Sequence, residues 1–383
     1  MKKDTFIYGY YGLSNLGDDL LILSIITRLQ KSKFAEKYFI RNYGKVDILS
    51  RKENIIYTYL ETHIVSKKTL FQKLSGLYFY ARAHHKVFKT CHSMILGGGT
   101  LISGHSSAKS LFLIWLISLL AKINSLKVYG VGLGVAKLDT PVKRFLARCI
   151  INNCDFLGIR DDISLKQLKS VTTKECVHLT ADLIFESQNL IFDKVKTTNS
   201  LAVNMIGISI VGLFLKNENK KEIVLGSLVE AIEDWVQNGI HVRLFSFQNS
   251  KNDVLYSDKL FLDEILNTFR ESPMVSLVEL DSSISSINSG FSSIDVLVGM
   301  RFHGAVLAAM SYKPFVGFSC DHKMSSLCDS FAMPFMDMDH LTSEWLVSAA
   351  KVRLDVDIYN NQLEALSALS AKNYKFLVEA SGP

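Results

Sequence analysis

Short apolar runs that end in glycine alternate along the chain with stretches whose apolar residues recur at helical spacing. In the first half, this pattern predicts strands over residues 5–12, 92–100, 125–134 and 155–161, and helices over residues 15–30, 111–121, 141–153 and 163–170. Strands that alternate with helices in this way predict parallel sheets covered by helices on both faces.

A second series of the same kind follows a polar, irregular stretch at residues 187–200. It predicts strands over 201–212, 240–248, 274–280, 293–300 and 314–319, and helices over 220–239, 252–270, 301–311, 322–331 and from 342 towards the C-terminus. We therefore predict an α/β protein whose two Rossmann-like domains face each other across a cleft. We place the N-terminal domain at 1–190, the C-terminal domain at 200–340, and helices at 341–383 that we expect to pack back on the N-terminal domain.

Composition narrows the class of protein. With 383 residues, of which 48% are hydrophobic and 21% charged, the chain is long enough to bury one or two cores. Lys and Arg number 43 against 37 Asp and Glu, and the resulting charge of +6 falls short of a nucleic-acid-binding signature. This charge fits anionic small molecules or an anionic membrane face. The six cysteines lack C-x-x-C and zinc-finger spacing, and the N-terminus lacks a signal-peptide pattern, so we expect a cytoplasmic protein with reduced thiols.

The mean hydropathy of +0.18 is high for a water-soluble protein, and the most apolar run covers residues 111–121. This run is too short to cross a bilayer, which needs about 20 apolar residues. A helix buried between the sheet and a neighbouring helix explains it. The alternative is peripheral membrane contact, with the apolar face on lipid and the flanking Lys109, Lys122 and Lys127 at the headgroups.

Ligands of doubly wound α/β folds bind beyond the carboxyl ends of the strands, so residues at strand ends are the candidates for a site. Gly12, Asn15 and Gly17 lie between the first predicted strand and its helix, whose N-terminus offers N–H groups and a positive dipole end. The spacing is not that of a dinucleotide fingerprint. Asp18 and Asp19 follow at the helix start, where we expect at least one of them to cap the helix.

Three further glycine-rich or cationic strand ends are candidates. Gly98, Gly99 and Thr100 form a turn that suits an anion or a sugar ring, although a tight connection alone would also explain it. The glycines at 130–134 fit close strand–helix packing and a ligand role equally well. Arg160 ends another predicted strand, where it either pairs with Asp161 or Asp182 or binds a carboxylate or phosphate.

The most informative strand end carries Arg301 and His303 in the first turn of a predicted helix. Because a cation is unfavourable at the positive end of a helix, an arginine there favours anion binding over a purely structural role. Together with the histidine and free N–H groups, it predicts a site that binds an anion and transfers a proton. Lys323 follows a later strand and is either a second phosphate contact or a solvated surface lysine.

The ordered set of motifs resembles the polysaccharide pyruvyl transferases of bacterial surface-polysaccharide synthesis. The matching segments are GYYGLSNLGDD at 9–19, MILGGGT at 94–100, VYGVGLG at 128–134, IRDDIS at 159–164, ADLIF at 181–185 and RFHGAVLAAMSYKPFVGFSCDHK at 301–323. The resemblance covers residues 5–330, and the R-x-H segment with the later D-x-K is its most specific part. One departure is Leu183, where the family usually has Pro.

The resemblance implies a GT-B-like architecture, phosphoenolpyruvate as donor, and a sugar in a surface polysaccharide or its lipid-linked precursor as acceptor. The product would be a pyruvate ketal that bridges two hydroxyls, formed without a metal or redox cofactor. Carried onto this chain, the family implies the following roles: His303 as general acid/base; Arg301, Arg160 and Lys323 as donor-binding cations; Asp18 as base; and Gly12, Asn15, Gly17, Gly98, Gly99 and Thr100 on the acceptor side.

Two alternatives remain open at this stage. One is a nucleotide-sugar glycosyltransferase of the same fold, which would also place a basic cleft against phosphates. The other is a non-catalytic scaffold of a polysaccharide assembly complex.

Overall fold

The computed structural model describes residues 3–42, 46–50, 52–58, 70–102, 108–135, 138–192, 202–248, 257–280 and 283–380. The chain forms two compact units, each assembled from separated segments. Unit 1 comprises Met1–Leu13, Asp18–Glu186 and Leu366–Pro383, and unit 2 comprises Ser14–Gly17 and Ser187–Ala365. Most of the irregular stretch at 187–200, namely residues 193–200, lies outside the described residues.

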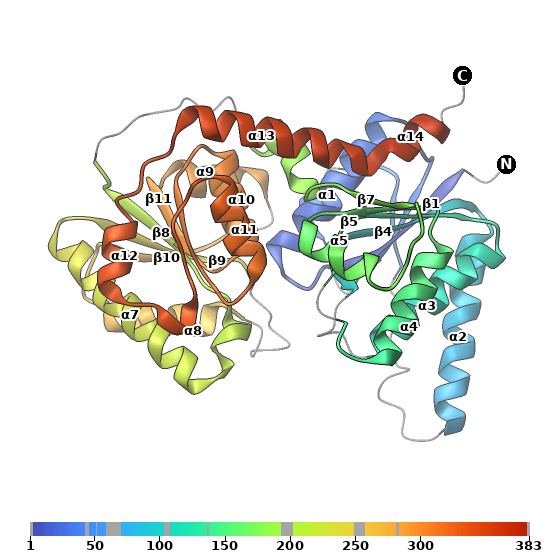
Figure 1. The fold of residues 1–383 in the computed structure, drawn as a ribbon, viewed down its shortest axis with the longest axis horizontal. Helices are drawn as coiled ribbons and strands as arrows, with labels where there is room; N and C mark the ends of the chain where they lie inside the picture. The colour runs from blue at the N-terminus through green and yellow to red at the C-terminus, as the bar shows by residue number, and fades with distance from the viewer. Residues whose placement is uncertain are drawn as a thin grey trace. The chain divides into compact units, whose positions relative to one another are not determined.

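Unit 1 is built on a seven-stranded parallel sheet with the strand order β3-β2-β1-β4-β5-β6-β7 (Figure 1). Its strands are β1 (Asp4–Tyr11), β2 (Tyr38–Asn42), β3 (Ile55–Thr58), β4 (Cys91–Ile102), β5 (Lys127–Val135), β6 (Phe156–Ile159) and β7 (Val177–Leu179). Its helices are α1 (Leu16–Lys31), η1 (Asp47–Leu49), α2 (Leu70–Phe88), α3 (Ala108–Ile123), α4 (Pro141–Asn153), α5 (Asp162–Lys169), η2 (Leu183–Ser187), η6 (Lys372–Tyr374) and α14 (Lys375–Ala380).

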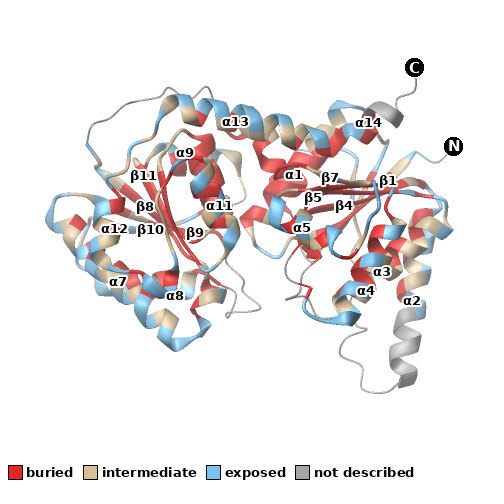
Figure 2. Cartoon of the chain, viewed as in Figure 1, coloured by how far each residue is buried: buried red, intermediate tan, exposed pale blue. Residues whose placement is uncertain are grey.

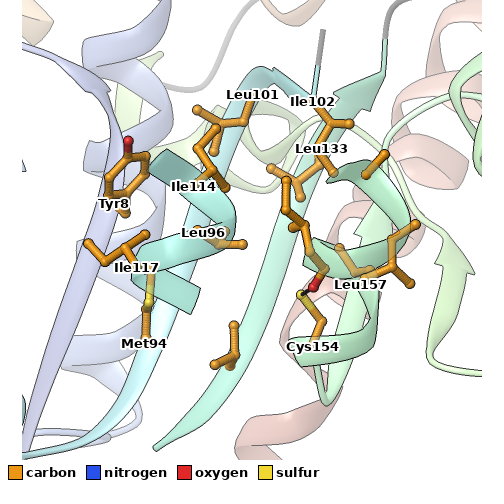
Figure 3. Packing of buried hydrophobic residues seen from close by; sticks show 14 of the residues in the cluster. Tyr8, Met94, Leu96, Leu101, Ile102, Ile114, Ile117, Leu133, Cys154 and Leu157 are labelled. Carbon is orange, nitrogen blue, oxygen red and sulfur yellow. Dashed lines mark hydrogen bonds between the residues drawn. The ribbon is translucent and has the colours of Figure 1, made fainter. Parts of the chain in front are cut away.

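Successive side chains of a strand point to opposite faces of the sheet, so the contacts of neighbouring residues show which helices cover each face. Met94 and Leu96 of β4 belong to the core cluster that also contains Ile114 and Ile117 of α3 (Figure 3). Gly97, on the opposite face, lies against Ile25 of α1. The helices α2, α3 and α4 therefore form one layer, in which α3 contacts both neighbours, and α1 lies on the other face.

Unit 2 is built on a six-stranded parallel sheet with the order β10-β9-β8-β11-β12-β13. Its strands are β8 (Met205–Ser209), β9 (His241–Ser246), β10 (Val275–Glu279), β11 (Val296–Gly299), β12 (Phe315–Phe318) and β13 (Phe335–Met336). Its helices are α6 (Gln188–Ile191), η3 (Gly212–Lys216), α7 (Glu218–Gln237), α8 (Lys259–Thr268), α9 (Ile284–Ser292), α10 (Phe302–Met310), α11 (His322–Ser330), η5 (Met338–His340) and α12 (Ser343–Ala349). The helix α13 (Val356–Ala371) begins in unit 2 and ends in unit 1.

Buried residues line both sheets, as Figure 2 shows, and each unit has a core of its own. The prediction of an α/β protein with two parallel sheets is confirmed. Most strands are shorter than predicted, for example Met205–Ser209 where 201–212 was expected, but β4 is longer, at Cys91–Ile102 against 92–100. The helix expected at 252–270 begins at Lys259, with residues 252–256 outside the described part. Among the described residues, no helix is both long and apolar enough to cross a membrane.

The sequence pattern missed several elements, and their composition explains why. The strands β2, β3 and β7 are three to five residues long, too short for a clear period of two. The helix α2 (Leu70–Phe88) is also missing from the prediction. Helix α9 has the serine-rich sequence ISSINSGFS, which has a weak helix propensity, but Ser283 caps it by accepting a hydrogen bond from the Ser286 N–H at 3.1 Å.

Candidate active site

The sheet of unit 2 changes its direction of winding between β8 and β11, because β9 lies on one side of β8 and β11 on the other. In open α/β sheets, this switch point is where ligands bind. The two strand ends are close together there: a Cβ added to Gly299, the last residue of β11, would lie 2.1 Å from the Oγ atom of Ser209, the last residue of β8. Arg301 follows at the N-cap of α10, at this edge of the sheet.

Arg301 forms an ion pair with the buried carboxylate of Asp258. Its Nε atom donates to Asp258 Oδ2 at 3.0 Å and to the Ile210 carbonyl at 3.2 Å, and its Nη2 atom donates to Asp258 Oδ1 and, at 3.1 Å, to Gln248 Oε1. An arginine at the positive end of a helix is therefore held by a carboxylate, which offsets the unfavourable dipole.

Asp258 ties the ends of three strands together, and sequence reasoning did not identify it. Besides Arg301, which follows β11, it accepts hydrogen bonds from the N–H groups of Gly212, after β8, and Phe247, after β9, at 3.2 and 3.3 Å. Burial raises the pKa of its carboxyl, and the charge of Arg301 and these hydrogen bonds act in the opposite direction. The sequence signal was weak, since a single Asp before a helix normally indicates a cap.

His303 is the second residue of α10, and it lies directly against Gly17. A Cβ on Gly17 would be 1.9 Å from the His303 Nδ1 atom, so only glycine leaves room for this imidazole. The short segment around Gly17 is held to unit 2 by backbone contacts: the Leu16 N–H donates to the Phe247 carbonyl at 3.0 Å, and Asn15 forms an antiparallel bridge with Gln248.

Residues that are far apart in the sequence thus meet at one edge of unit 2. The structure brings Asn15 and Gly17, which we predicted for the acceptor side, to Arg301 and His303, through the Gly17–His303 contact and through Gln248, which contacts both Asn15 and Arg301. Within the segment, Asn15 Oδ1 accepts a hydrogen bond from the Gly17 N–H at 3.2 Å and fixes its turn.

Lys323 lies in the first turn of α11, which follows β12, the strand next to β11. Asp321 caps this helix by accepting a hydrogen bond from the Lys323 N–H at 3.0 Å. The Lys323 Nζ atom is 3.7 Å from the second oxygen of the same carboxylate. Two consecutive helix N-termini, each with a cation, therefore lie at the same edge of this sheet. Across the described ranges, no cluster of three or more His, Cys, Asp and Glu side chains is arranged to hold a metal ion.

The sheet of unit 1 has its own switch point, between β1 and β4, and the other predicted glycines lie there. Gly98 and Gly99 adopt left-handed backbone conformations, with φ of +62° and +72°. The predicted turn after the strand is wrong, because β4 continues through both glycines to Ile102 with an irregular register beyond Gly99. The Tyr11 hydroxyl donates to the Gly97 carbonyl at 2.6 Å and holds this part of β4 to the end of β1.

The two acidic residues at the start of α1 have different surroundings. Asp19 is buried and accepts a hydrogen bond from the Gly12 N–H at 3.2 Å, which gives it a structural role in the loop. Asp18 is half-buried, and its Oδ1 atom would lie 3.3 Å from a Cβ on Gly99. Of the two carboxylates, Asp18 is therefore the one beside Gly99 of β4.

Arg160 lies apart from this switch point in sheet order, after β6, but its guanidinium reaches back to β4. Its Nη1 atom forms an ion pair with Asp182 at 2.8 Å, and Nη2 donates to Thr100 Oγ1 at 3.3 Å. The side chain is only 6% exposed. Of the alternatives that the sequence left open, the structure shows the pairing with Asp182 and a longer contact with Asp161 at 3.9 Å; a role in donor binding stays a prediction.

The fold defined by these two units is GT-B-like. The chain is similar to a solved UDP-N-acetylglucosamine 2-epimerase, with 14% identity and a TM-score of 0.65 over 100% of this chain and 97% of that one. It is also similar to UDP-GlcNAc 2-epimerase from Neisseria meningitidis bound to UDP-GlcNAc (12% identity, TM-score 0.61, 99% of each chain) and to MurG from Acinetobacter baumannii (11% identity, TM-score 0.54, 98% of this chain and 99% of that one). No curated protein matches the sequence.

The family follows from the sequence itself. The profile of the polysaccharide pyruvyl transferase family matches residues 15–322, which include Asp258, Arg301 and His303. The chain belongs to the polysaccharide pyruvyl transferase family.

Proposed function

We propose that this protein transfers pyruvate from phosphoenolpyruvate to two hydroxyls of a sugar, in a surface polysaccharide or its lipid-linked precursor, and forms a pyruvate ketal. The observation that carries the proposal is the position of the R-x-H segment, which begins α10 at the switch point of the unit 2 sheet in a chain of this family. The site combines a cation, an imidazole and a helix N-terminus, which suit an anionic substrate that must be protonated.

The electrostatics of the unit 2 edge support this donor. Phosphoenolpyruvate carries a phosphate and a carboxylate, and both need cations or N–H donors. Arg301 is oriented by Asp258 and Gln248, and α10 and α11 begin side by side in sheet order, with Lys323 in the first turn of α11. We assign phosphoenolpyruvate binding to Arg301 and Lys323 and propose Arg160 as a further donor-binding cation.

The chemistry can be written with these groups. His303, as general acid, protonates C3 of phosphoenolpyruvate, and C2 becomes oxocarbenium-like. One sugar hydroxyl adds to C2 and loses its proton to a base, for which Asp18 is our candidate. The C2–O bond to phosphate then breaks, inorganic phosphate leaves with the electron pair, and the second hydroxyl attacks C2 and releases its own proton. The balance is one phosphoenolpyruvate and two hydroxyls to one ketal and one phosphate, without a metal or redox cofactor.

We place the acceptor sugar against Gly12, Asn15, Gly17, Gly98, Gly99 and Thr100. Gly98 and Gly99 are buried within β4, so the support for this placement is the neighbouring pair of Asp18 and Thr100, which are half-buried at the same end of the sheet. We further propose a cytoplasmic location, at the inner membrane face if the acceptor is lipid-linked.

The test is incubation of the purified protein with phosphoenolpyruvate and candidate glycan acceptors. We expect phosphate release together with an acceptor mass increase of about 70 Da, the pyruvate ketal increment. His303→Ala should abolish both signals, whereas His340→Ala, an exposed histidine elsewhere in unit 2, should abolish neither.

Two results would contradict the proposal. Unchanged ketal formation by His303→Ala would remove the role of this residue. Sugar transfer from a nucleotide sugar, without any product from phosphoenolpyruvate, would favour the glycosyltransferase alternative.

A further inference from the structure

The positive charge of this protein is concentrated in one stretch of the chain. Residues 62–138 contain ten Lys and Arg and no Asp or Glu, whereas the whole chain has a net charge of +6. The rest of the chain is therefore net acidic, at −4. Such an acid-free stretch of 77 residues indicates a surface from which negative charge is excluded.

The structure places the helices of this stretch in one layer on the unit 1 sheet. Helices α2 and α3 come from it and α4 follows it, and none of the three contains an acidic residue. They cover the same face of the unit 1 sheet, and their inner sides belong to its core, for example Phe88, Ile114 and Ile150. We call their outer surface the basic helix layer.

Large apolar side chains are exposed on this layer. Tyr78 and Phe79 of α2 are 60% and 62% exposed, with their rings edge to face, and Phe145 of α4 is 64% exposed. Val142 and Ile123 are also exposed. Single exposed apolar residues are common, but five of the eleven that the structure describes lie on these three helices.

Cations lie beside Phe79. Phe79, Arg82, Lys86 and Lys89 line one surface groove, and the three cations are exposed. The acidic groups near the layer are neutralised: Asp139 pairs with Lys143 at 3.0 Å, and Asp155 contacts Lys122 and Lys127 at 2.9 and 3.4 Å. Aromatic side chains with surrounding Lys and Arg are the pattern of a surface that enters the headgroup region of an anionic membrane.

We propose that the basic helix layer docks this protein on an anionic lipid surface, with Tyr78, Phe79 and Phe145 entering the headgroup region and Arg82, Lys86 and Lys89 contacting lipid phosphates. A second copy of the chain is a poor occupant, since a symmetric contact would bring two basic faces together. The structure also refines the apolar run at 111–121: Leu111, Ile114 and Ile117 of that run are buried in the core, so the contact with lipid falls mainly on α2 and α4.

The proposal goes beyond the transfer reaction and does not rest on it, so its test needs no substrate. The full-length protein is floated with vesicles of phosphatidylcholine alone and of phosphatidylcholine with phosphatidylglycerol. We expect binding to the anionic vesicles only, weakened by high salt because exposed charges are screened. The affinity of the double variant Arg82→Gln/Lys86→Gln for the anionic vesicles should fall by at least about tenfold. Phe79→Ser/Phe145→Ser should also lose binding.

Controls separate docking from general charge and from misfolding. Lys351→Gln/Lys372→Gln removes two exposed lysines outside the layer and should bind like the unchanged protein. All variants should keep their far-UV circular dichroism and melting temperature, since the altered side chains are exposed. Equal binding to neutral and anionic vesicles, unchanged binding of both layer variants, or retention by nucleic acid without vesicle binding would overturn the proposal.

Discussion

At the scale of single residues, the candidate site depends on two groups whose role is visible only through their neighbours. Gly17 matters because of the side chain it lacks, since the His303 imidazole occupies the space where a Cβ would be. Asp258 matters because it is buried with four donors around it and orients Arg301. Both residues position other groups and need not touch a substrate themselves.

The variant Gly17→Ala tests whether the space that Gly17 leaves for the His303 imidazole matters. The added methyl must displace His303 from its position, and a displacement of about 1 Å can reduce the turnover rate about a hundredfold. We expect ketal formation to fall by that order while the protein stays folded. The matched control is Gly226→Ala on α7, where nothing lies within 4 Å of the new Cβ, so activity should be unchanged. Equal activity in both variants would mean that the Gly17–His303 contact is irrelevant to turnover.

The variant Asp258→Asn tests whether Asp258 orients Arg301. Removing one charge from a buried ion pair leaves the other uncompensated and costs about 3–5 kcal/mol. We expect a lower free energy of unfolding in urea and a higher KM for phosphoenolpyruvate, because Arg301 loses its orienting partner. The double variant Asp258→Asn/Arg301→Gln should be less destabilised than the sum of the single variants.

The exposed Asp329→Asn on α11 serves as the control and should change neither quantity. If the effects of the double variant simply add, the two side chains do not act as a pair.

At the scale of elements, the helix starts and the order of strands are what create the site. Helices α10 and α11 follow neighbouring parallel strands, so their N-termini share one edge of the sheet. Helix α2, by contrast, contributes to stability through His84, which is buried between Phe6, Tyr80 and Phe88. Its Nδ1 atom lies 2.8 Å from the Tyr80 carbonyl.

His84 should make the protein sensitive to mild acid. Burial, together with the nearby charge of Arg41, lowers the pKa of His84 from 6.5 to about 3. Below pH 6.5, His84 of the unfolded chain takes up a proton, whereas the buried His84 of the folded chain takes it up only near pH 3. Stability is therefore lost as the pH falls through this window, by about 1.4 kcal/mol for each pH unit.

Urea unfolding at pH 7 and pH 5 measures this effect. We expect the unchanged protein to lose about 2 kcal/mol more over this interval than His84→Phe, which has no proton to bind. His241→Phe, at an exposed position, should behave like the unchanged protein. An identical pH dependence for His84→Phe would exclude His84 as the cause.

At the scale of the whole molecule, each unit is assembled from segments that are distant in the sequence. Ser14–Gly17 belongs to unit 2, whereas the residues on either side of it belong to unit 1. The C-terminal segment returns to unit 1, where the buried Asn373 accepts a hydrogen bond from the Gly132 N–H at 2.7 Å and donates to the Ala181 carbonyl at 3.0 Å.

Binding of the proposed donor should stabilise the whole chain by mass action. At a phosphoenolpyruvate concentration of about 100 times Kd, the free energy of unfolding should rise by about 2.7 kcal/mol. This rise is measured as a higher melting temperature in the presence of the donor and should be absent in Arg301→Gln. A similar rise with Arg301→Gln, or one produced equally by inorganic sulfate, would show that the binding is not the one proposed.

The fold class, the family and most of the element order can be predicted from the sequence alone. Periodicity and glycine-ended strands are local properties, and parallel strands buried on both faces leave a strong apolar signal. The same local reasoning located Arg301 and His303 at a helix start. It failed for the short strands β2, β3 and β7 and for α9, where few residues carry the signal, and it also missed the longer helix α2.

Which side chains meet is visible only in the folded chain. The Arg301–Asp258 pair, the Gly17–His303 contact and the reach of Arg160 to Thr100 join residues 43, 286 and 60 positions apart, and no local pattern encodes such pairings. The acid-free stretch was present in the sequence, but only the fold shows that α2, α3 and α4 share one layer. The physical reason is that hydrophobic periodicity fixes which face of an element is buried, whereas long-range contacts depend on how the elements pack together.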